Sequence, residues 1–235
     1  GGALPAVSPL QPAPMPTRSK RRYTSAPARP ALPYYGSKWR LSSWVRTFFP
    51  PHHIYCEPYG GSAAVLLRKD PSPVEIYNDR DDQVVNFFRV IRDATSRTQL
   101  LEQLELTPYA KAEFLASYGS EEIPNVEAAR RLFVRGWQGY GSAGASTDRS
   151  VGWARTTPPA RQSQLRSWLS ASPNLGRVAD RLRQVHIEHD DASTVLDRYD
   201  SPETLFYLDP PYVKSTLTAN KDYRHDYVDE DHRRL

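Results

Sequence analysis

Short apolar segments separated by polar turns are the main feature of the hydrophobic pattern. Ile54 to Gly61 begins apolar and breaks into a glycine pair, Val74 to Tyr77 is a second apolar run, and Val185 to Ile187 is a third. A fourth run starts at Leu205. Because short apolar runs bounded by turn residues are typical of buried strands, these segments predict a β-sheet.

Two segments that follow these runs predict helices. Ser62 to Lys69 comes directly after the glycine pair and has a helical pattern. Asp81 to Asp93 places its apolar residues on one helical face, which we expect to pack on the sheet. Strands that alternate with helices predict an α/β fold. The apolar residues of the second helix are Val84, Val85, Phe87, Phe88, Val90 and Ile91.

Composition divides the chain into a tail, a divided α/β domain and an insert. The tail is rich in Pro and Ala, carries basic residues and lacks apolar periodicity, so we expect it to be disordered. It contains Met15, the only methionine, which is a candidate translation start. The insert lacks strong strand signals and predicts helices around a loop at 139–159 that is rich in Gly, Ser, Thr and Arg. The predicted parts are residues 1–30, residues 31–105 with 184–235, and the insert 106–183.

Charge is segregated along the chain more strongly than the net charge of +4 suggests. No acidic residue precedes Glu57, and ten arginines but only two acidic residues lie between Arg130 and Arg183. From Glu188 onward acidic residues outnumber basic ones. This separation predicts one basic face, for which a phosphate backbone is the natural partner.

The fourth apolar run ends in a group of residues suited to chemistry on a nucleobase amine. Asp209, Pro210, Pro211 and Tyr212 follow it directly. An exocyclic amine shares its lone pair with the ring, so it becomes nucleophilic only when acceptors draw its N–H groups. A carboxylate and a carbonyl left free beside two prolines could be those acceptors, and the tyrosine ring could stack on the base. The alternative is an ordinary strand end with a Pro-Pro turn.

The glycine pair after the first run predicts a nucleoside site. A glycine-rich turn between a strand and a helix lets backbone approach a ligand closely. Asp79 lies 19 residues after Gly60, at the end of the second run, where nucleoside-binding α/β folds place an acid for ribose hydroxyls. The turn lacks the full dinucleotide fingerprint and the P-loop lysine, so it does not favour phosphate binding.

These segments resemble the D12 class of adenine-specific DNA methyltransferases, the Dam-like enzymes. The resemblance runs in order from about Tyr34 to the C-terminus. It implies a Rossmann-like sheet that binds S-adenosylmethionine, with an inserted helical DNA-recognition domain at 106–183. The matching segments are Y-Y-G-S-K-W-R-L from Tyr34, E-P-Y-G-G-S-A-A-V-L-L-R-K from Glu57, N-D at Asn78, R-R-L-F-V-R-G-W-Q-G-Y-G from Arg130 and D-P-P-Y from Asp209.

The resemblance also implies the role of each site residue. Tyr34 and Lys38 match positions beside the cofactor, Asp79 matches the ribose-binding acid, and Asp191 matches the acid that meets the cofactor's adenine, with Asp190 as the alternative in register. The implied cofactor residues are Tyr34, Lys38, Glu57, Pro58, Tyr59, Gly60, Gly61, Asp79 and Asp191. The implied catalytic residues are Asp209, Pro210, Pro211 and Tyr212, and the candidate DNA contacts are Arg135, Arg149 and Arg155.

Each residue also has an ordinary structural interpretation. Lys38 could be a solvated surface charge, Asp79 and Asp191 could cap helices, and Tyr59 could belong to the core. Any single arginine of the insert could lie on an exposed helix face. The order in which the motifs occur, rather than any one of them, favours the functional interpretation.

The single cysteine, Cys56, lies inside an apolar strand and should pack as a small hydrophobe. A covalent cysteine mechanism is therefore not expected, whereas direct transfer to an exocyclic nitrogen needs only orientation and acceptors. Adenine N6 and cytosine N4 both fit this logic, and the resemblance favours adenine flipped out of the duplex. No metal is expected, because the six histidines form no ligand-spaced cluster with Cys56.

Only 23 residues follow Tyr212, fewer than the resemblance implies for a complete sheet. We therefore expect a homodimer contact, a partner chain or a shorter closure of the fold to complete the sheet beyond the catalytic strand, which would otherwise be an exposed edge. Alternatives to an active enzyme on double-stranded DNA are a noncatalytic DNA-binding or assembly protein and a cytosine-N4 or RNA methyltransferase. With no long apolar span or signal peptide, we expect no membrane association and a cytoplasmic location in a bacterial or phage-infected cell.

Overall fold

The computed structural model describes residues 26–119, 121–155, 161–212, 223–225 and 227–235. Most of the tail that the sequence predicts to be disordered, including Met15, lies outside the described residues.

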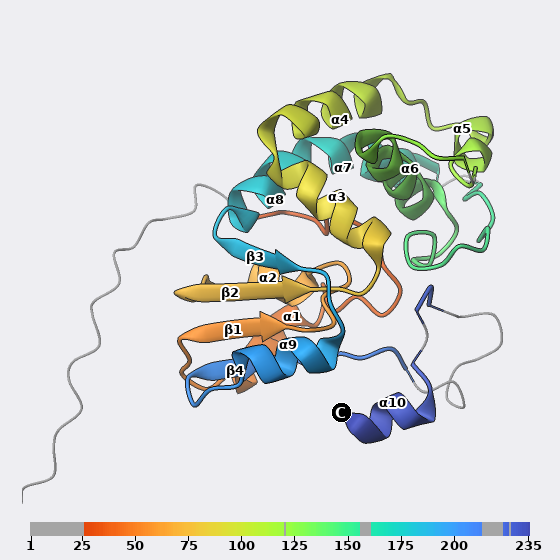
Figure 1. The fold of residues 1–235 in the computed structure, drawn as a ribbon. Coiled ribbons are helices and arrows are strands. Elements are labelled where there is room, and N and C mark those ends of the chain that lie inside the picture. Colours follow the sequence, from red (N-terminus) through yellow and green to blue (C-terminus); the bar gives the residue numbers. More distant parts are fainter. Residues whose placement is uncertain (1–25, 120, 156–160, 213–222, 226) are drawn as a thin grey trace, which may run out of the picture.

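Four parallel strands form one sheet within the described residues, in the order β3-β2-β1-β4 (Figure 1). They are β1 (Ile54–Glu57), β2 (Val74–Asn78), β3 (Val185–Glu188) and β4 (Thr204–Phe206). Each predicted apolar run overlaps one of these strands, so the prediction of a mixed α/β fold is confirmed. Because the strands are parallel, the residues that follow them meet at one edge of the sheet.

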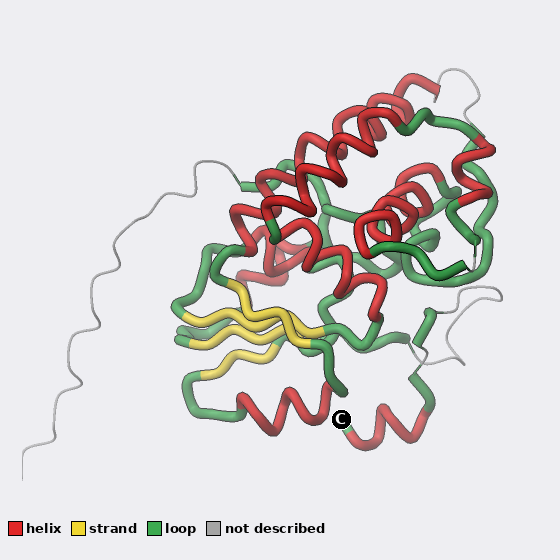
Figure 2. Tube along the Cα trace, turned by 45° about the horizontal axis from the view of Figure 1, so that its top comes forward, coloured by secondary structure: helices red, strands yellow, loops and turns green. Residues whose placement is uncertain are grey.

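Strand residues alternate between the two faces of the sheet, as the period of two requires. Tyr77 belongs to the large core under most of the helices. Its neighbour Ile76 packs with Cys56 against Val195 on the opposite face, which helix α9 (Ala192–Tyr199) covers. Figure 2 shows this helix on one side of the strands and the larger helical layer on the other.

Helix α3 (Asp82–Arg92) belongs to the larger helical layer and confirms the amphipathic helix predicted at Asp81 to Asp93. The Asp81 side chain caps α3 by accepting the backbone N–H of Gln83 at 3.0 Å. Helices of this layer are α2 (Ala64–Arg68), α3 (Asp82–Arg92), α4 (Ala94–Leu106), α6 (Asn125–Gln138), α7 (Arg161–Ala171) and α8 (Leu175–Leu182). The remaining helical segments are α1 (Ser42–Val45), η1 (Arg46–Phe48), α5 (Lys111–Ala116), η2 (Ser172–Asn174) and α10 (Asp229–Arg234).

The predicted insert shares its hydrophobic core with the sheet. Phe133 of α6 stacks on Phe87 of α3, with ring centroids 6.2 Å apart, and both belong to the same buried cluster as Tyr77. Helix α8, although inside the predicted insert, contacts α2 and α3. The described residues of 106–183 include helices α5, α6, α7 and α8, whereas their separation into a recognition domain stays a prediction.

A buried ion triad connects α8 to strand β2 and helix α2. Arg181 donates to Glu75 at 2.7 Å and to the backbone carbonyl of Leu66 in α2 at 2.8 Å. Lys69 donates to the same carboxylate at 2.5 Å. Because one carboxylate serves two cations here, the pKa of Glu75 is lowered by Arg181 and Lys69 despite its burial. The pKa of Lys69 is lowered, chiefly by desolvation.

No helix among the described residues is long and apolar enough to cross a membrane. Strand β4 lies at an edge of the described sheet. A partner chain or second copy that covers it stays a prediction.

Candidate active site

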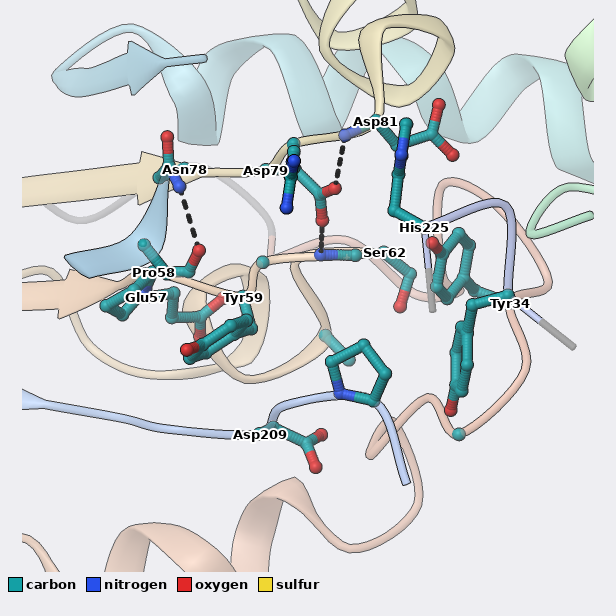
Figure 3. A pocket seen from close by; sticks show the side chains of 18 of the residues that line it. Tyr34, Glu57, Pro58, Tyr59, Ser62, Asn78, Asp79, Asp81, Asp209 and His225 are labelled. Carbon is teal, nitrogen blue, oxygen red and sulfur yellow. Dashed lines mark hydrogen bonds between the residues drawn. The ribbon is translucent and has the colours of Figure 1, made fainter. Parts of the chain in front are cut away.

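A pocket lies at the carboxyl ends of the parallel strands, where the sequence places most of its candidate residues. The turns after β1, β2, β3 and β4 all contribute to its lining, together with the segment 34–38. Asp79 and Asp209 lie on opposite sides of it (Figure 3). Of the implied cofactor residues, the lining includes Tyr34, Lys38, Glu57, Pro58, Tyr59, Gly60, Gly61, Asp79 and Asp191.

The glycine pair after β1 is needed for close backbone packing rather than for flexibility alone. A Cβ on Gly60 would lie 2.1 Å from Cε2 of Tyr77, whose side chain is fully buried. Gly61 has a φ of +47°, a conformation that favours glycine. Tyr77 also donates its hydroxyl to the Gly61 carbonyl at 2.7 Å, which fixes the turn against β2.

Replacing Gly60 with alanine should destabilise the protein by about 1–3 kcal/mol, because the new methyl group overpacks a rigid aromatic neighbour. Gly176→Ala is the matched control. Gly176 lies within α8 and a Cβ there meets nothing within 4 Å, so the control should be neutral or stabilising. Denaturant unfolding of both variants checks this. Equal stability of the two variants would contradict the packing argument.

Asp79 accepts hydrogen bonds from the backbone of the glycine turn and from the backbone at the start of α3. Its carboxylate accepts the N–H of Gly61 at 2.6 Å and the N–H of Asp81 at 2.8 Å, contacts drawn in Figure 3. Desolvation, reinforced by the nearby charge of Asp81, raises the pKa of Asp79 to about 6. The backbone bonds hold this acid at the pocket wall, where it can accept further donors from a ligand.

Glu57 is the most deeply enclosed acid of the site, with 2% of its surface exposed. It accepts the Tyr55 hydroxyl at 2.6 Å and the N–H of Leu66 in α2 at 2.7 Å. Burial raises its pKa to about 7. Glu57 therefore anchors the first turn of α2 under the glycine turn while still lining the pocket.

Lys38 contacts the D-P-P-Y segment rather than the glycine turn. Its Nζ donates to both carboxylate oxygens of Asp209 at 2.7 Å, and it also lies 2.9 Å from the Gly36 carbonyl and 3.3 Å from the Tyr212 hydroxyl. Desolvation lowers the pKa of Lys38, but the hydrogen bonds and charges of Asp209 and Tyr212 together outweigh it, so the pKa is raised. The structure thus joins a predicted cofactor residue to the predicted catalytic acid.

Asp209 and Pro211 line the pocket. Tyr212 is 40% exposed, and its ring meets Tyr35 edge to face at a centroid distance of 6.2 Å. The lining includes neither Pro210 nor Tyr212, and Lys38 Nζ lies over the Tyr212 ring, 5.4 Å from its centroid. Stacking of Tyr212 on a planar ligand therefore stays a prediction.

Asp191 is both a helix cap and a residue of the pocket lining. It accepts the N–H and the hydroxyl of Ser193 at 3.0 and 2.6 Å, so it caps α9, and it also lines the pocket. Its neighbour Asp190 is paired with Arg198 at 2.9 Å. Asn78 has no predicted role of its own, although it belongs to one of the matching segments. Its side chain donates to the Pro58 carbonyl at 2.9 Å and so joins the turns after β1 and β2.

The three arginines predicted to contact DNA lie in different environments. Arg135 is 7% exposed and donates to the Gln83 side chain, so direct contact would require it to leave this position. Arg149 and Arg155 are exposed on the loop between α6 and α7. Their roles stay predictions.

The segment after residue 222 supplies pocket residues that sequence reasoning missed. The hydroxyls of Tyr227 and Tyr59 are 2.6 Å apart, and Tyr223 and His225 also line the pocket. Arg224 pairs with Asp81 and lies 2.6 Å from Asp148 of the insert loop. No local pattern after D-P-P-Y signals these contacts, because they join residues far apart in the chain.

One cluster in the described part of the chain, Asp81, Asp82 and His225, brings three possible metal ligands within 4.8 Å of one another. Asp81 already pairs with Arg224. We therefore assign no metal to it.

Comparison with known proteins accounts for this arrangement of motifs. A search of curated proteins finds no match. The family described as D12 class N6 adenine-specific DNA methyltransferase matches residues 34–235, which include every pocket segment described above. Because the match spans most of the chain, the protein belongs to the D12 class of N6 adenine-specific DNA methyltransferases.

Proposed function

We propose that this protein transfers a methyl group from S-adenosylmethionine to N6 of an adenine flipped out of double-stranded DNA. The observation that carries the proposal is the placement of Asp209 beside a nitrogen donor, 2.7 Å from Lys38 Nζ, in the same pocket as Asp79 and the glycine turn. A carboxylate that already holds one nitrogen is suited to holding an amine.

The residues around the glycine turn fit a nucleoside cofactor. A Cβ on Gly61 would approach Tyr34 to 3.1 Å, so glycine keeps the space between the turn and that ring open. Asp79 offers carboxylate oxygens for ribose hydroxyls. Asp191, which also lines the pocket, would meet the adenine base of the cofactor. When bound, S-adenosylmethionine supplies an electrophilic methyl group on a sulfonium.

Cofactor affinity should depend on pH through Asp79. Since its pKa is raised to about 6, the carboxyl is neutral below that pH and ionised above it, and only the ionised form is a strong acceptor for hydroxyl groups. We expect cofactor affinity to rise by roughly tenfold between pH 5 and pH 7, because the ionised fraction of a carboxyl with this pKa rises by roughly tenfold over that range.

Calorimetric titrations with the cofactor across this range check the dependence. Asp79→Asn should bind weakly and lose the step near pH 6. Glu57, with its pKa raised to about 7, can add a second step that this variant retains. An unchanged step near pH 6 in Asp79→Asn would contradict the assignment.

At the target base, Asp209 and a backbone carbonyl would accept the two amine N–H groups. Pro210 and Pro211 lack N–H donors, which leaves neighbouring carbonyls free to face the base. Drawing the N–H groups aside turns the nitrogen lone pair out of conjugation and toward the methyl donor. The exposed ring of Tyr212 would stack on the flipped base. This stacking would partly offset the free energy of about a few kcal/mol that unstacking and unpairing the base cost.

DNA would bind across the exposed loop of the insert. Arg149 and Arg155 are the exposed candidates there, and the basic composition of 130–183 supports phosphate contact. Since phosphate contacts release counterions, affinity should fall steeply as salt rises.

The experiment that tests this function is mass spectrometry of nucleosides from DNA incubated with the protein and S-adenosylmethionine. N6-methyladenine in duplex DNA is the expected product. N4-methylcytosine, or modification of RNA in place of DNA, would replace the proposal with another amine substrate. Binding of DNA without any methylated nucleoside would favour a noncatalytic role.

A further inference from the structure

We propose that Lys38 is a switch that holds the target-amine position at Asp209 and is drawn away by the α-carboxylate of S-adenosylmethionine. The inference rests on the proposed function and deepens it. It makes cofactor binding a condition for the base to reach Asp209.

The first step is that Lys38 occupies the place where a substrate amine would bind. Its ammonium lies 2.7 Å from both oxygens of Asp209 and 2.9 Å from the Gly36 carbonyl. An amine under methylation becomes tetrahedral and gains positive charge, and the lysine ammonium has both properties. An adenine amine that approaches Asp209 therefore meets acceptors that are already engaged.

The second step is that this ammonium can leave. The Lys38 and Asp209 side chains are 20% and 28% exposed, so the pair is only partly buried and water can compete for it. Lysine carries its charge on a flexible four-carbon stem, so Nζ can move several ångströms without backbone change. The buried pair of Lys69 and Glu75, with side chains 4% and 1% exposed, lacks this freedom.

The third step is that the pocket lining has few other cations that could pair with a carboxylate ligand. Among the described residues that line it, only Lys38 and Arg80 carry a permanent positive charge, against Glu57, Asp79, Asp81, Asp190, Asp191 and Asp209. Arg80 is 62% exposed and lies 3.8 Å from Asp191. Lys38, 20% exposed, is the more buried of the two cations, so we expect a cofactor carboxylate in this acidic pocket to pair with it.

The consequence is a competition between two carboxylates for one ammonium. In the arrangement described above Asp209 holds Lys38, and its oxygens are engaged. In the loaded pocket the cofactor carboxylate holds Lys38, and Asp209 is free to accept the amine N–H groups. The base would then be captured after the cofactor, which prevents an unproductive complex with flipped DNA.

The test uses two ligands that differ in the amino-acid part. S-adenosylhomocysteine carries the α-carboxylate, and 5′-methylthioadenosine lacks it. NMR of lysine labelled with ¹⁵N at Nζ should show the Lys38 ammonium signal, assigned by its loss in Lys38→Met, shifting with the first ligand only. The Lys69 signal serves as internal reference, because its partner Glu75 lies outside the pocket lining.

A second readout follows the base itself. With 2-aminopurine at the adenine mapped by methylation, fluorescence from flipping should rise several-fold when S-adenosylhomocysteine saturates the wild type, and little with 5′-methylthioadenosine. Lys38→Met should flip the base strongly with either ligand or none. A Lys38 signal that both ligands leave unchanged, or flipping that both promote equally, would overturn the switch.

The two proposals fail differently. Absence of S-adenosylhomocysteine binding in calorimetry would remove the proposed function and the switch with it. Binding that leaves Lys38 on Asp209, in a protein that still methylates DNA, would overturn the switch alone.

Discussion

Asp209→Ala should lose at least about 100-fold in methyl transfer while it still binds the cofactor, since removing one preorganised polar group of an active site typically costs 10²–10³ in rate. Its carboxylate is the acceptor proposed for the target amine, and it lies across the pocket from Asp79 (Figure 3). Because Lys38 loses its partner, cofactor affinity should stay the same or increase. Single-turnover transfer and calorimetry together measure the two effects.

Asp197→Ala is the matched control for this variant. Asp197 is an exposed aspartate on α9, outside the pocket lining, so its loss should change neither rate nor affinity. Parallel loss of binding and transfer in Asp209→Ala would instead make Asp209 part of the cofactor site.

The largest effect on stability is expected for Glu75→Ala. This change leaves Lys69 and Arg181 buried without their shared carboxylate, and breaking a buried ion pair typically costs about 3–5 kcal/mol. For a chain of this length that lowers the melting temperature by roughly 6–20 °C, at about 2–4 °C per kcal/mol. Calorimetry of purified protein measures it.

The pH dependence gives an independent check on the triad. Because the pKa of Glu75 is lowered in the folded state, its contribution is present above the unfolded pKa and is lost as pH falls through the folded value. Wild type should therefore lose stability in acid faster than Glu75→Ala does. The exposed Glu102→Ala on α4 is the control and should match wild type within about 0.5 kcal/mol. A Glu75→Ala variant as stable as that control would show that the triad contributes no net stability.

Local pattern was sufficient to predict the strands and the main sheet helix. The four apolar runs correspond to the four strands, because each is short, apolar and bounded by turn residues. The glycine pair and Asp79 were predictable together, since parallel strands bring their carboxyl ends to one edge. Both meet there through the 2.6 Å bond between the Gly61 N–H and the Asp79 carboxylate.

Contacts between distant segments were not predictable from spacing. Lys38 and Asp209 are 171 residues apart, and no local pattern favoured this pairing over a cofactor contact for Lys38. Arg135 was a candidate for DNA because of its charge, yet helix packing buries it. Glu75 lies inside the second apolar run, but the sequence did not indicate that it would pair with two cations, one of them 106 residues away.

The measurement that tests the central claim most directly is transfer of tritium from labelled S-adenosylmethionine to unmethylated duplex DNA, with digestion to nucleosides and Asp209→Ala in parallel. The account predicts label in N6-methyladenine from the wild type and almost none from the variant. Folded wild-type protein that binds the cofactor and the duplex yet leaves adenine unlabelled would contradict it.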